Sequence, residues 1–385
     1  MSHSAQGGGI YIHFPFCTAR CHYCDFNVYA VPAIPQETYS DAIVKELETR
    51  ASDASDFPII SIFLGGGTPS LWDTRQVSRV LQTVQEHYTV DPHAEITMEM
   101  NPNETSEAGL DAILEAGCNR VSLGVQSLRD PLLKKMDRRH SAKQALEALA
   151  WLSNRGFKSW SADLIFGLPD QTLEVWEEDV QRLLDTGLPH LSTYNLMVET
   201  TTPLHRMVQQ GKVVLPEEEE QVQMLMVGRD RVRKQGLEPY EISNSARPGH
   251  ESVHNTLYWN GNPYLGIGAG AHGFLPKEGG GRRQMNIRKY TEYMRSVLTN
   301  GTAIGTWEDV SPETHGIELL MTGLRKTEGV HMATLNQRTG LSLDRLFEEQ
   351  FAELVKEGLL IQSGDWLRLT EESIPVSDAV FLKFF

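Results

Sequence analysis

Six short apolar segments, rich in β-branched residues and each followed by a stretch with helical spacing, constrain the fold of this chain most. They span 9–14, 59–64, 95–100, 120–125, 159–166 and 190–197. Repeated alternation of strand and helix predicts parallel strands joined by right-handed crossovers. The pattern fits an open doubly wound α/β sheet or a full or partial (β/α) barrel, and either arrangement places its chemistry at the carboxyl ends of the strands. Ser106 and Ser141 are the predicted N-caps of two of the helices.

Polar, glycine-rich or cysteine-bearing motifs follow five of these segments at the predicted carboxyl ends. They are residues 17–24 after the first segment, 65–69 after the second, 99–102 at the third, Gln126 after the fourth and 163–169 on the fifth. Because the carboxyl ends of parallel strands lie along one edge, the five motifs are expected to form one shared site.

The length of 385 residues exceeds the size at which one hydrophobic core stops growing, so more than one domain is expected. We predict a barrel over 1–236. A flanking segment over 237–305, with a strand at 239–243 and glycine-rich loops, is expected beside the barrel mouth. Over 306–385 we predict two or three helices and a hairpin of 359–362 with 366–370, which together resemble a winged-helix domain.

The net charge argues against two classes of partner, nucleic acids and anionic membranes, because both are themselves negatively charged. The chain has 35 Lys and Arg against 51 Asp and Glu, a net charge of −16. Residues 308–385 carry 7 basic against 14 acidic side chains, so the winged-helix-like module is not expected to bind nucleic acid. No apolar run approaches a membrane span, and the polar start at residues 1–9 has no leader pattern. A cytoplasmic protein without a stable membrane span is therefore predicted.

Three of the four cysteines lie within eight residues, in the spacing Cys17-x-x-x-Cys21-x-x-Cys24. Three thiolates in one short loop can bind three corners of a cubane [4Fe-4S] cluster and leave the fourth iron open to another ligand. A structural zinc held by the same cysteines and His22 is the alternative. Cys118 stands apart, before an apolar strand, and is expected to be a buried small hydrophobe.

The motifs together resemble the radical S-adenosylmethionine (SAM) superfamily, in the branch of the oxygen-independent coproporphyrinogen III oxidases and the HemW heme chaperones. The residues that carry the resemblance are Tyr11-Ile-His-Phe-Pro-Phe-Cys17 with the cysteine triad, Gly65-Gly-Gly-Thr-Pro69, Glu99-Met-Asn-Pro102, Leu123-Gly-Val-Gln-Ser127, Arg138-Arg-His140 and Asp163-Leu-Ile-Phe-Gly-Leu-Pro169. The resemblance extends over nearly the whole chain, including the closing helical module. It implies a partial (β/α)6 barrel of the TIM type with a C-terminal helical domain.

The resemblance also implies a SAM molecule on the open iron, which needs a reductant for the cluster. The residues that it places around SAM are Tyr11, Tyr23, Gly66, Gly67, Thr68, Glu99, Gln126, Arg138 and Asp163. The residue types suit this ligand, since carboxylates accept from an ammonium or from ribose hydroxyls and Arg138 can pair with a carboxylate. Without the resemblance, the three glycines would also fit an ordinary βα turn, and Asp163 a hydrogen-bonded core carboxylate.

One position separates the two groups of the branch. The oxidases have a further cysteine two residues after the third, and here that position is Phe26. The segment His254-Asn-Thr-Leu-Tyr-Trp259 resembles the His-Asn-x-x-Tyr-Trp motif of the chaperones. The resemblance therefore favours a heme chaperone that binds heme and transfers it to acceptor proteins over the alternative, an enzyme that oxidatively decarboxylates coproporphyrinogen III.

His254 is the expected axial ligand of the heme, with Tyr258 and Trp259 offering flat apolar surface to the macrocycle. Taken without the resemblance, the favoured interpretation is that His254 caps or packs a surface turn and that the two aromatic residues are ordinary core side chains. His250, His272 and Cys118 are competing ligands.

Overall fold

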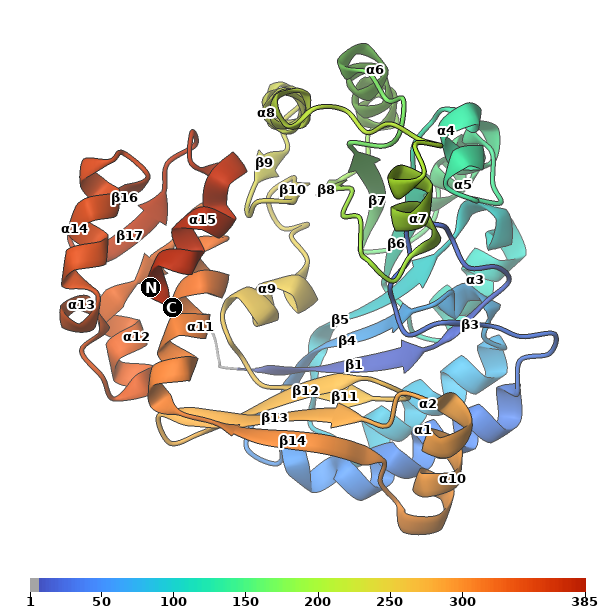
Figure 1. The fold of residues 1–385 in the computed structure, drawn as a ribbon. Coiled ribbons are helices and arrows are strands. Elements are labelled where there is room, and N and C mark those ends of the chain that lie inside the picture. The colour runs from blue at the N-terminus through green and yellow to red at the C-terminus, as the bar shows by residue number, and fades with distance from the viewer. Residues whose placement is uncertain (1–6) are drawn as a thin grey trace.

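The computed structural model describes residues 7–385, so the first six residues of the predicted leaderless start lie outside it. Twelve strands form one open, mixed sheet in the order β14-β13-β12-β11-β1-β4-β5-β6-β7-β8-β10-β9 (Figure 1). Their bounds are β1 Gly8–Phe14, β4 Ile59–Gly66, β5 Val90–Met100, β6 Arg120–Gln126, β7 Ser159–Phe166, β8 His190–Asn195, β9 Glu238–Pro239, β10 Asn244–Ala246, β11 Tyr264–Ile267, β12 His272–Lys277, β13 Gly280–Asn286 and β14 Ile304–Val310. The architecture is an α/β fold with a partial barrel.

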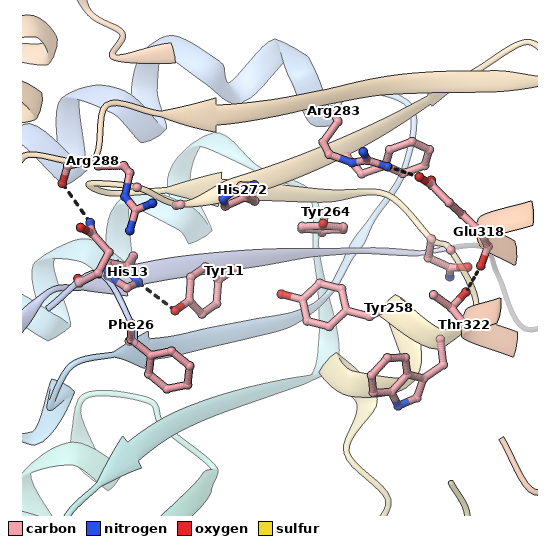
Figure 2. Close-up of a pocket in the computed structure, with 18 of the residues that line it drawn as sticks. Tyr11, His13, Phe26, Tyr258, Tyr264, His272, Arg283, Arg288, Glu318 and Thr322 are labelled. Carbon is pink, nitrogen blue, oxygen red and sulfur yellow. Dashed lines mark hydrogen bonds and ion pairs between the residues drawn. The ribbon is translucent and has the colours of Figure 1, made fainter. Parts of the chain in front are cut away.

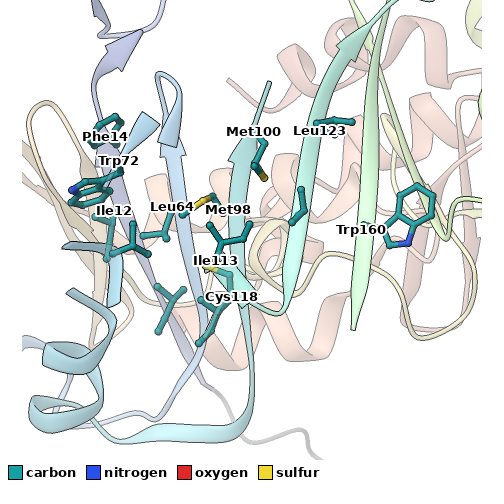
Figure 3. Close-up of a cluster of buried hydrophobic side chains, with 14 of the residues drawn as sticks. Ile12, Phe14, Leu64, Trp72, Met98, Met100, Ile113, Cys118, Leu123 and Trp160 are labelled. Carbon is teal, nitrogen blue, oxygen red and sulfur yellow. The ribbon is translucent and has the colours of Figure 1, made fainter. Parts of the chain in front are cut away.

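The six segments predicted from apolar spacing are the parallel strands β1 and β4 to β8. Each pairs in parallel with the next along the chain, as the alternation with helices predicted. Their side chains are buried on both faces, which is why they read as continuous apolar runs. Figure 3 shows part of the hydrophobic core between the parallel strands and their helices, in which Ile12, Leu64 and Leu123 are fully buried. Cys118 is also fully buried there, and this burial raises the pKa of its thiol to about 12.

Helices follow the parallel strands, and local signals define their starts. Their bounds are α1 Gln36–Arg50, α2 Thr74–His87, α3 Glu107–Glu115, α4 Asp130–Lys135, α5 Ala142–Ser153, α6 Leu173–Leu184, α7 Pro203–Gln209, α8 Glu218–Lys234, α9 Val253–Trp259 and α10 Tyr290–Asn300. Ser106 caps α3 by accepting from the Gly109 N–H, and Ser141 forms a capping box with Gln144 on α5, so both predicted N-caps are confirmed. Among the described residues, no helix is long and apolar enough to cross a membrane.

The segment 237–305 is more regular than the sequence predicted. The expected strand at 239–243 is wrong: β9 ends at Pro239 and β10 begins only at Asn244. Strands β11 to β14 extend the sheet beyond β1, with β11 parallel to β1 and the next three antiparallel. Their glycine-rich sequences carry little alternating apolar pattern, so the sequence pattern predicts loops where the structure has strands.

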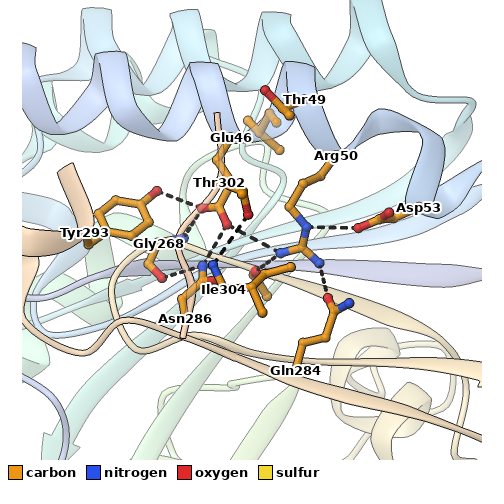
Figure 4. Close-up of polar contacts among 12 residues, drawn as sticks. Glu46, Thr49, Arg50, Asp53, Gly268, Gln284, Asn286, Tyr293, Thr302 and Ile304 are labelled. Carbon is orange, nitrogen blue, oxygen red and sulfur yellow. Dashed lines mark hydrogen bonds and ion pairs between the residues drawn. The ribbon is translucent and has the colours of Figure 1, made fainter. Parts of the chain in front are cut away.

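A buried polar network attaches this extension to the barrel (Figure 4). The carboxylate of Glu46 on α1 is fully buried and accepts from the Gly268 N–H, from Asn286 Nδ2 at 2.7 Å and from the Tyr293 hydroxyl at 2.7 Å. Arg50, one turn later, donates to the Gly266 carbonyl at 2.8 Å. Apart from Arg50 on the same helix, the partners of the Glu46 carboxylate come from the extension, namely Gly268 directly after β11, Asn286 on β13 and Tyr293 on α10. Because a buried charge needs these partners, they fix how the extension docks on α1.

The C-terminal module has its own apolar core and a small sheet in the order β15-β17-β16. Its elements are α11 Pro312–Leu324, β15 Val330–His331, α12 Met332–Thr339, α13 Leu343–Leu346, α14 Glu348–Lys356, β16 Leu360–Ser363, β17 Trp366–Leu369 and α15 Ser377–Phe381. Strands β16 and β17 form the hairpin predicted from the sequence. Helix α11 contacts β13 and α9, so the module lies against the extension and over the start of the barrel (Figure 1).

Candidate functional site

The carboxyl ends of the parallel strands surround a cavity of about 550 Å³, here called the cysteine cavity. It is lined by Cys17, Cys21 and Cys24 and by eight of the nine residues expected around SAM, which are Tyr23, Gly66, Gly67, Thr68, Glu99, Gln126, Arg138 and Asp163. The ninth, Tyr11, lines a neighbouring cavity instead. The five motifs therefore lie together at one edge of the sheet.

Cys17 ends the short strand β2 Phe16–Cys17, and Cys21 and Cys24 lie in the loop after it. Polar groups already contact two of the three sulfurs. Thr68 Oγ1 donates to Cys17 Sγ at 3.5 Å, and Arg138 Nη1 lies 3.7 Å from Cys21 Sγ. Burial raises the pKa of the Cys17 thiol to about 11, so a thiolate at this position needs a cation beside it. Within residues 7–385, no group of three or more metal-binding side chains is gathered around a single ion position. A cubane cluster differs from a single ion because it binds each thiolate at a separate corner.

The glycines after β4 allow a close approach of backbone segments. Gly66 has φ +111°, a conformation that favours glycine, and a Cβ on Gly67 would lie 2.6 Å from the Phe16 carbonyl oxygen. The glycine segment thus packs directly beneath the cysteine loop. The Gly66 N–H points at the neighbouring strand and donates to Glu99 Oε2 at 2.9 Å.

Two partly buried carboxyls lie in the cysteine cavity, Glu99 on β5 and Asp163 on β7. Burial raises the pKa of Glu99 to about 7, the Gly66 hydrogen bond lowers it, and the charge of Asp163 raises it. Burial also raises the pKa of Asp163, which accepts from the Ser122 hydroxyl at 3.1 Å. Two desolvated carboxyls in one cavity favour a ligand that carries cationic or hydroxyl donors.

Arg138 is a partly buried cation of the same cavity. Its Nη2 donates to Asn101 Oδ1 and to the Gly124 carbonyl, both at 2.6 Å, while its Nε has no partner among the described residues. Asn101 and Ser122 were not among the residues expected from sequence, although both lie on or beside strands already assigned to the site. The available signal was their position within or next to the motifs 99–102 and 123–127.

Gln126 ends β6 in a left-handed conformation, φ +66°, at a register shift between β6 and β7. A non-glycine residue there is sparsely populated, and strain of this kind clusters at functional sites. The irregular pairing turns the end of β6 so that Gln126 lines the cysteine cavity.

A second cavity of about 660 Å³, here called the aromatic cavity, adjoins the first (Figure 2). Tyr258 and Trp259 from α9, Tyr264 from β11 and Phe274 from β12 line it. Further lining residues are His13, His272, Arg283, Arg288 and His315. Phe26, Gly66 and Glu99 line both cavities and so form the boundary between them.

His254 lines neither cavity and is 1% exposed. Its Nδ1 lies 2.9 Å from Ser61 Oγ and its Nε2 lies 2.8 Å from the Tyr258 hydroxyl, so both ring nitrogens are engaged inside the protein. Burial lowers the pKa of His254 to about 3, which keeps the imidazole neutral. The structure thus differs from the expectation of an available axial ligand, because α9 packs inside the barrel against β1 and β4. Tyr258 and Trp259 do face a cavity, as expected.

The three competing heme ligands also differ in where they lie relative to the two cavities. Cys118 is in the core on the far side of the sheet, and His250 contacts Ser159 Oγ at 3.0 Å through its Nδ1. Of the three competitors, only His272 lines a cavity.

Comparison with known protein families gives two matches. The Radical SAM superfamily matches residues 11–183, and the HemN C-terminal domain matches residues 310–376. The fold and the cysteine cavity therefore define a radical SAM protein with a HemN-type C-terminal module.

Similar proteins narrow this class. The heme chaperone HemW of Bacillus subtilis is 34% identical over 377 residues, which are 97% of this chain and 98% of that protein. A mouse protein, radical S-adenosyl methionine domain-containing protein 1, mitochondrial, is 36% identical over 97% of this chain and 86% of its own length. The solved structure of coproporphyrinogen III oxidase (HemN) from Escherichia coli has a TM-score of 0.83 at 22% identity, covering 99% of this chain and 90% of that one, and shows a shared fold. The chain belongs to the HemW family, within the HemN-like branch of the radical SAM superfamily.

Proposed function

We propose that this protein is a heme chaperone, which binds heme and hands it to acceptor proteins, and which carries a SAM-binding [4Fe-4S] cluster. The name of the bacterial relatives supports the heme function. The match to the Radical SAM superfamily supports the cluster and SAM. A cytoplasmic location and a separate reductant for the cluster remain predictions.

The observation that carries this proposal is the pair of adjoining cavities. One is bordered by three thiols and partly buried charges, and the other by aromatic side chains and histidines. A heme presents large flat apolar faces, an iron that takes histidine ligands, and two carboxylates at one edge. Aromatic walls, histidines and arginines are the groups that match those three properties.

The residues of the cysteine cavity fit the cluster and SAM. Cys17, Cys21 and Cys24 would hold three irons, with Thr68 and Arg138 already placed to contact sulfur. When bound, the cluster and SAM together supply one-electron cleavage of the sulfonium. Arg138 would pair with the carboxylate of SAM, while Glu99 and Asp163 would accept hydrogen bonds from its ammonium or ribose hydroxyls. Exclusion of water by the buried walls strengthens each of these contacts.

The test is anaerobic reconstitution of the cluster followed by two parallel assays. One adds heme and measures its binding and its transfer to an apo-protein; the other adds coproporphyrinogen III, SAM and a reductant. We expect heme binding and transfer without formation of protoporphyrinogen IX, since Phe26 replaces the further cysteine of the oxidases. Turnover of coproporphyrinogen III without heme transfer would overturn the proposal. Iron without sulfide, or zinc in place of both, would contradict the cluster.

A further inference from the structure

Three histidines line the aromatic cavity, and they differ in what their ring nitrogens already contact. His13 is buried, with Nδ1 2.9 Å from the Tyr11 hydroxyl and Nε2 2.9 Å from the Asn27 carbonyl oxygen. His315 on α11 is 5% exposed and packs its ring 5.3 Å from Phe274, although its Nδ1 has no partner within residues 7–385. His272 is exposed, and neither of its ring nitrogens has a hydrogen-bond partner in the same part of the chain.

We propose that the aromatic cavity is the heme site and that His272 at the start of β12 is an axial ligand of the iron, with Arg288 pairing with a propionate. This inference rests on the proposed heme function and names the residues that would carry it. An accessible imidazole with both nitrogens free can bind iron without breaking an existing contact.

The charges around the cavity support the role given to Arg288. Arg283 already forms ion pairs with Glu308 and Glu318, so its charge is compensated within the protein. Arg288 has no side-chain ion pair among residues 7–385, and it lies at the same end of the cavity as His272, away from Glu318 (Figure 2). A bound heme would thus point its carboxylates toward the one end where a cation lacks a partner.

Burial lowers the pKa of His272, and the charges of Arg283 and Arg288 lower it further, so its imidazole is neutral near pH 7. Neutral imidazole is the form that binds iron. His272 and Arg288 are both exposed at the cavity mouth. A ligand that must be handed on can leave more readily from a site whose iron ligand and propionate partner lie at the surface.

The cysteine loop is anchored beside this same end of the cavity. Asn27, three residues after Cys24, donates from Nδ2 to the Ala269 carbonyl at 3.0 Å and to the Arg288 carbonyl at 2.9 Å. Ala269 belongs to the turn that leads into His272. The backbone that presents His272 and Arg288 is therefore held directly by the segment that follows the third cysteine.

In this arrangement His254 affects the heme site only indirectly, through the position of Tyr258. Its Nε2 contact with the Tyr258 hydroxyl fixes a ring that lines the cavity and lies edge-on to Tyr264, with ring centroids 4.6 Å apart. It is a positioning residue, and a substitution that keeps the two hydrogen bonds should leave iron ligation intact.

The experiment titrates heme into the full-length, cluster-loaded protein and records difference spectra against the same sample without heme. His272→Gln should weaken heme binding by about tenfold, equivalent to about 1.4 kcal/mol, and shift the Soret band. His315→Gln removes the other cavity histidine that has a ring nitrogen without a partner, and it should keep the parental Soret position if His272 is the ligand. His254→Gln, which can still bond to Ser61 and Tyr258, should keep it too. Arg288→Ala should weaken binding several-fold at low salt without moving the band.

Direct ligation is separated from a structural effect by rescue. Added imidazole should restore the parental Soret position in His272→Gly, and His272→Met should give a different axial signature. Parental spectra and affinity in His272→Gln, or loss of ligation only in His315→Gln or His254→Gln, would overturn this assignment while leaving the chaperone function standing. Absence of heme binding by the parent protein would instead overturn the proposed function, and this inference with it.

Discussion

The two cavities share Phe26, Gly66 and Glu99, yet their walls are built by different means. The cysteine cavity lies at the carboxyl ends of parallel strands and contains partly buried charged groups, namely Glu99, Asp163 and Arg138. The aromatic cavity is lined by residues of β1, α9, the extension and α11, and aromatic and imidazole rings are the largest group among its side chains. Buried charges suit a small polar ligand with fixed donors and acceptors, whereas rings suit a large flat one. The difference is what the proposal of two ligands, bound side by side, would require.

The largest expected effect is on the cluster. Individual replacement of Cys17, Cys21 or Cys24 by Ser should remove most of the bound iron and sulfide after anaerobic reconstitution, because each thiolate binds its own iron. Cys118→Ser, in the core, should retain the parental iron content. Heme binding by the cluster-free variants would show that the aromatic cavity works alone. Unchanged iron content in any of the three would remove that cysteine from the site.

The next effect concerns SAM. Asp163→Asn keeps the shape of the side chain and removes its charge, and it should weaken SAM binding by about 10- to 100-fold, the range expected for a lost charged hydrogen bond. Equilibrium dialysis of labelled SAM against the cluster-loaded protein measures this, with exposed Asp56→Asn as control. Heme affinity should not change. A parallel loss of heme affinity would mean that the two cavities bind one ligand.

Glu99, on the boundary between the cavities, makes SAM binding depend on pH. Its pKa is raised to about 7, and only the ionised carboxylate accepts from an ammonium, so SAM affinity should fall as the pH drops below 7. Well below the pKa the fall approaches about tenfold per pH unit. Glu99→Gln should bind SAM weakly and lose most of this dependence. SAM affinity should be measured below about pH 7.5, because an α-amino group such as that of SAM titrates near pH 8 and would add a pH dependence of its own. A parental pH profile in Glu99→Gln would exclude the role.

The smallest effect is on stability. Gln126 has φ +66°, so Gln126→Gly relieves backbone strain in the folded protein. Glycine also raises the conformational entropy of the unfolded chain, which opposes this gain, so the free energy of unfolding should change by less than about 1 kcal/mol. Gln126→Val should lower it by about 1–3 kcal/mol, because a β-branched side chain tolerates this conformation poorly. Urea titration compares the two. Equal stability of both variants would argue against strain at the end of β6.

The sequence alone determined the parallel half of the fold. Strands β1 and β4 to β8 have apolar runs and helical partners that are local in the chain, so their type, approximate bounds and parallel pairing could be predicted. The choice of a partial barrel over a doubly wound sheet came from the family resemblance. The same locality placed the cysteine triad, the glycines and Asp163 at neighbouring strand ends.

Only the tertiary structure decided the extension and the aromatic cavity. The extension is held on α1 by Glu46 and Arg50, whose partners at β11 and β13 lie more than 200 residues later in the chain. His254 and His272 have no local signal in the sequence which says that α9 buries the first inside the barrel while β12 exposes the second. Burial depends on packing between distant segments, and a single sequence does not show which distant segments pack together.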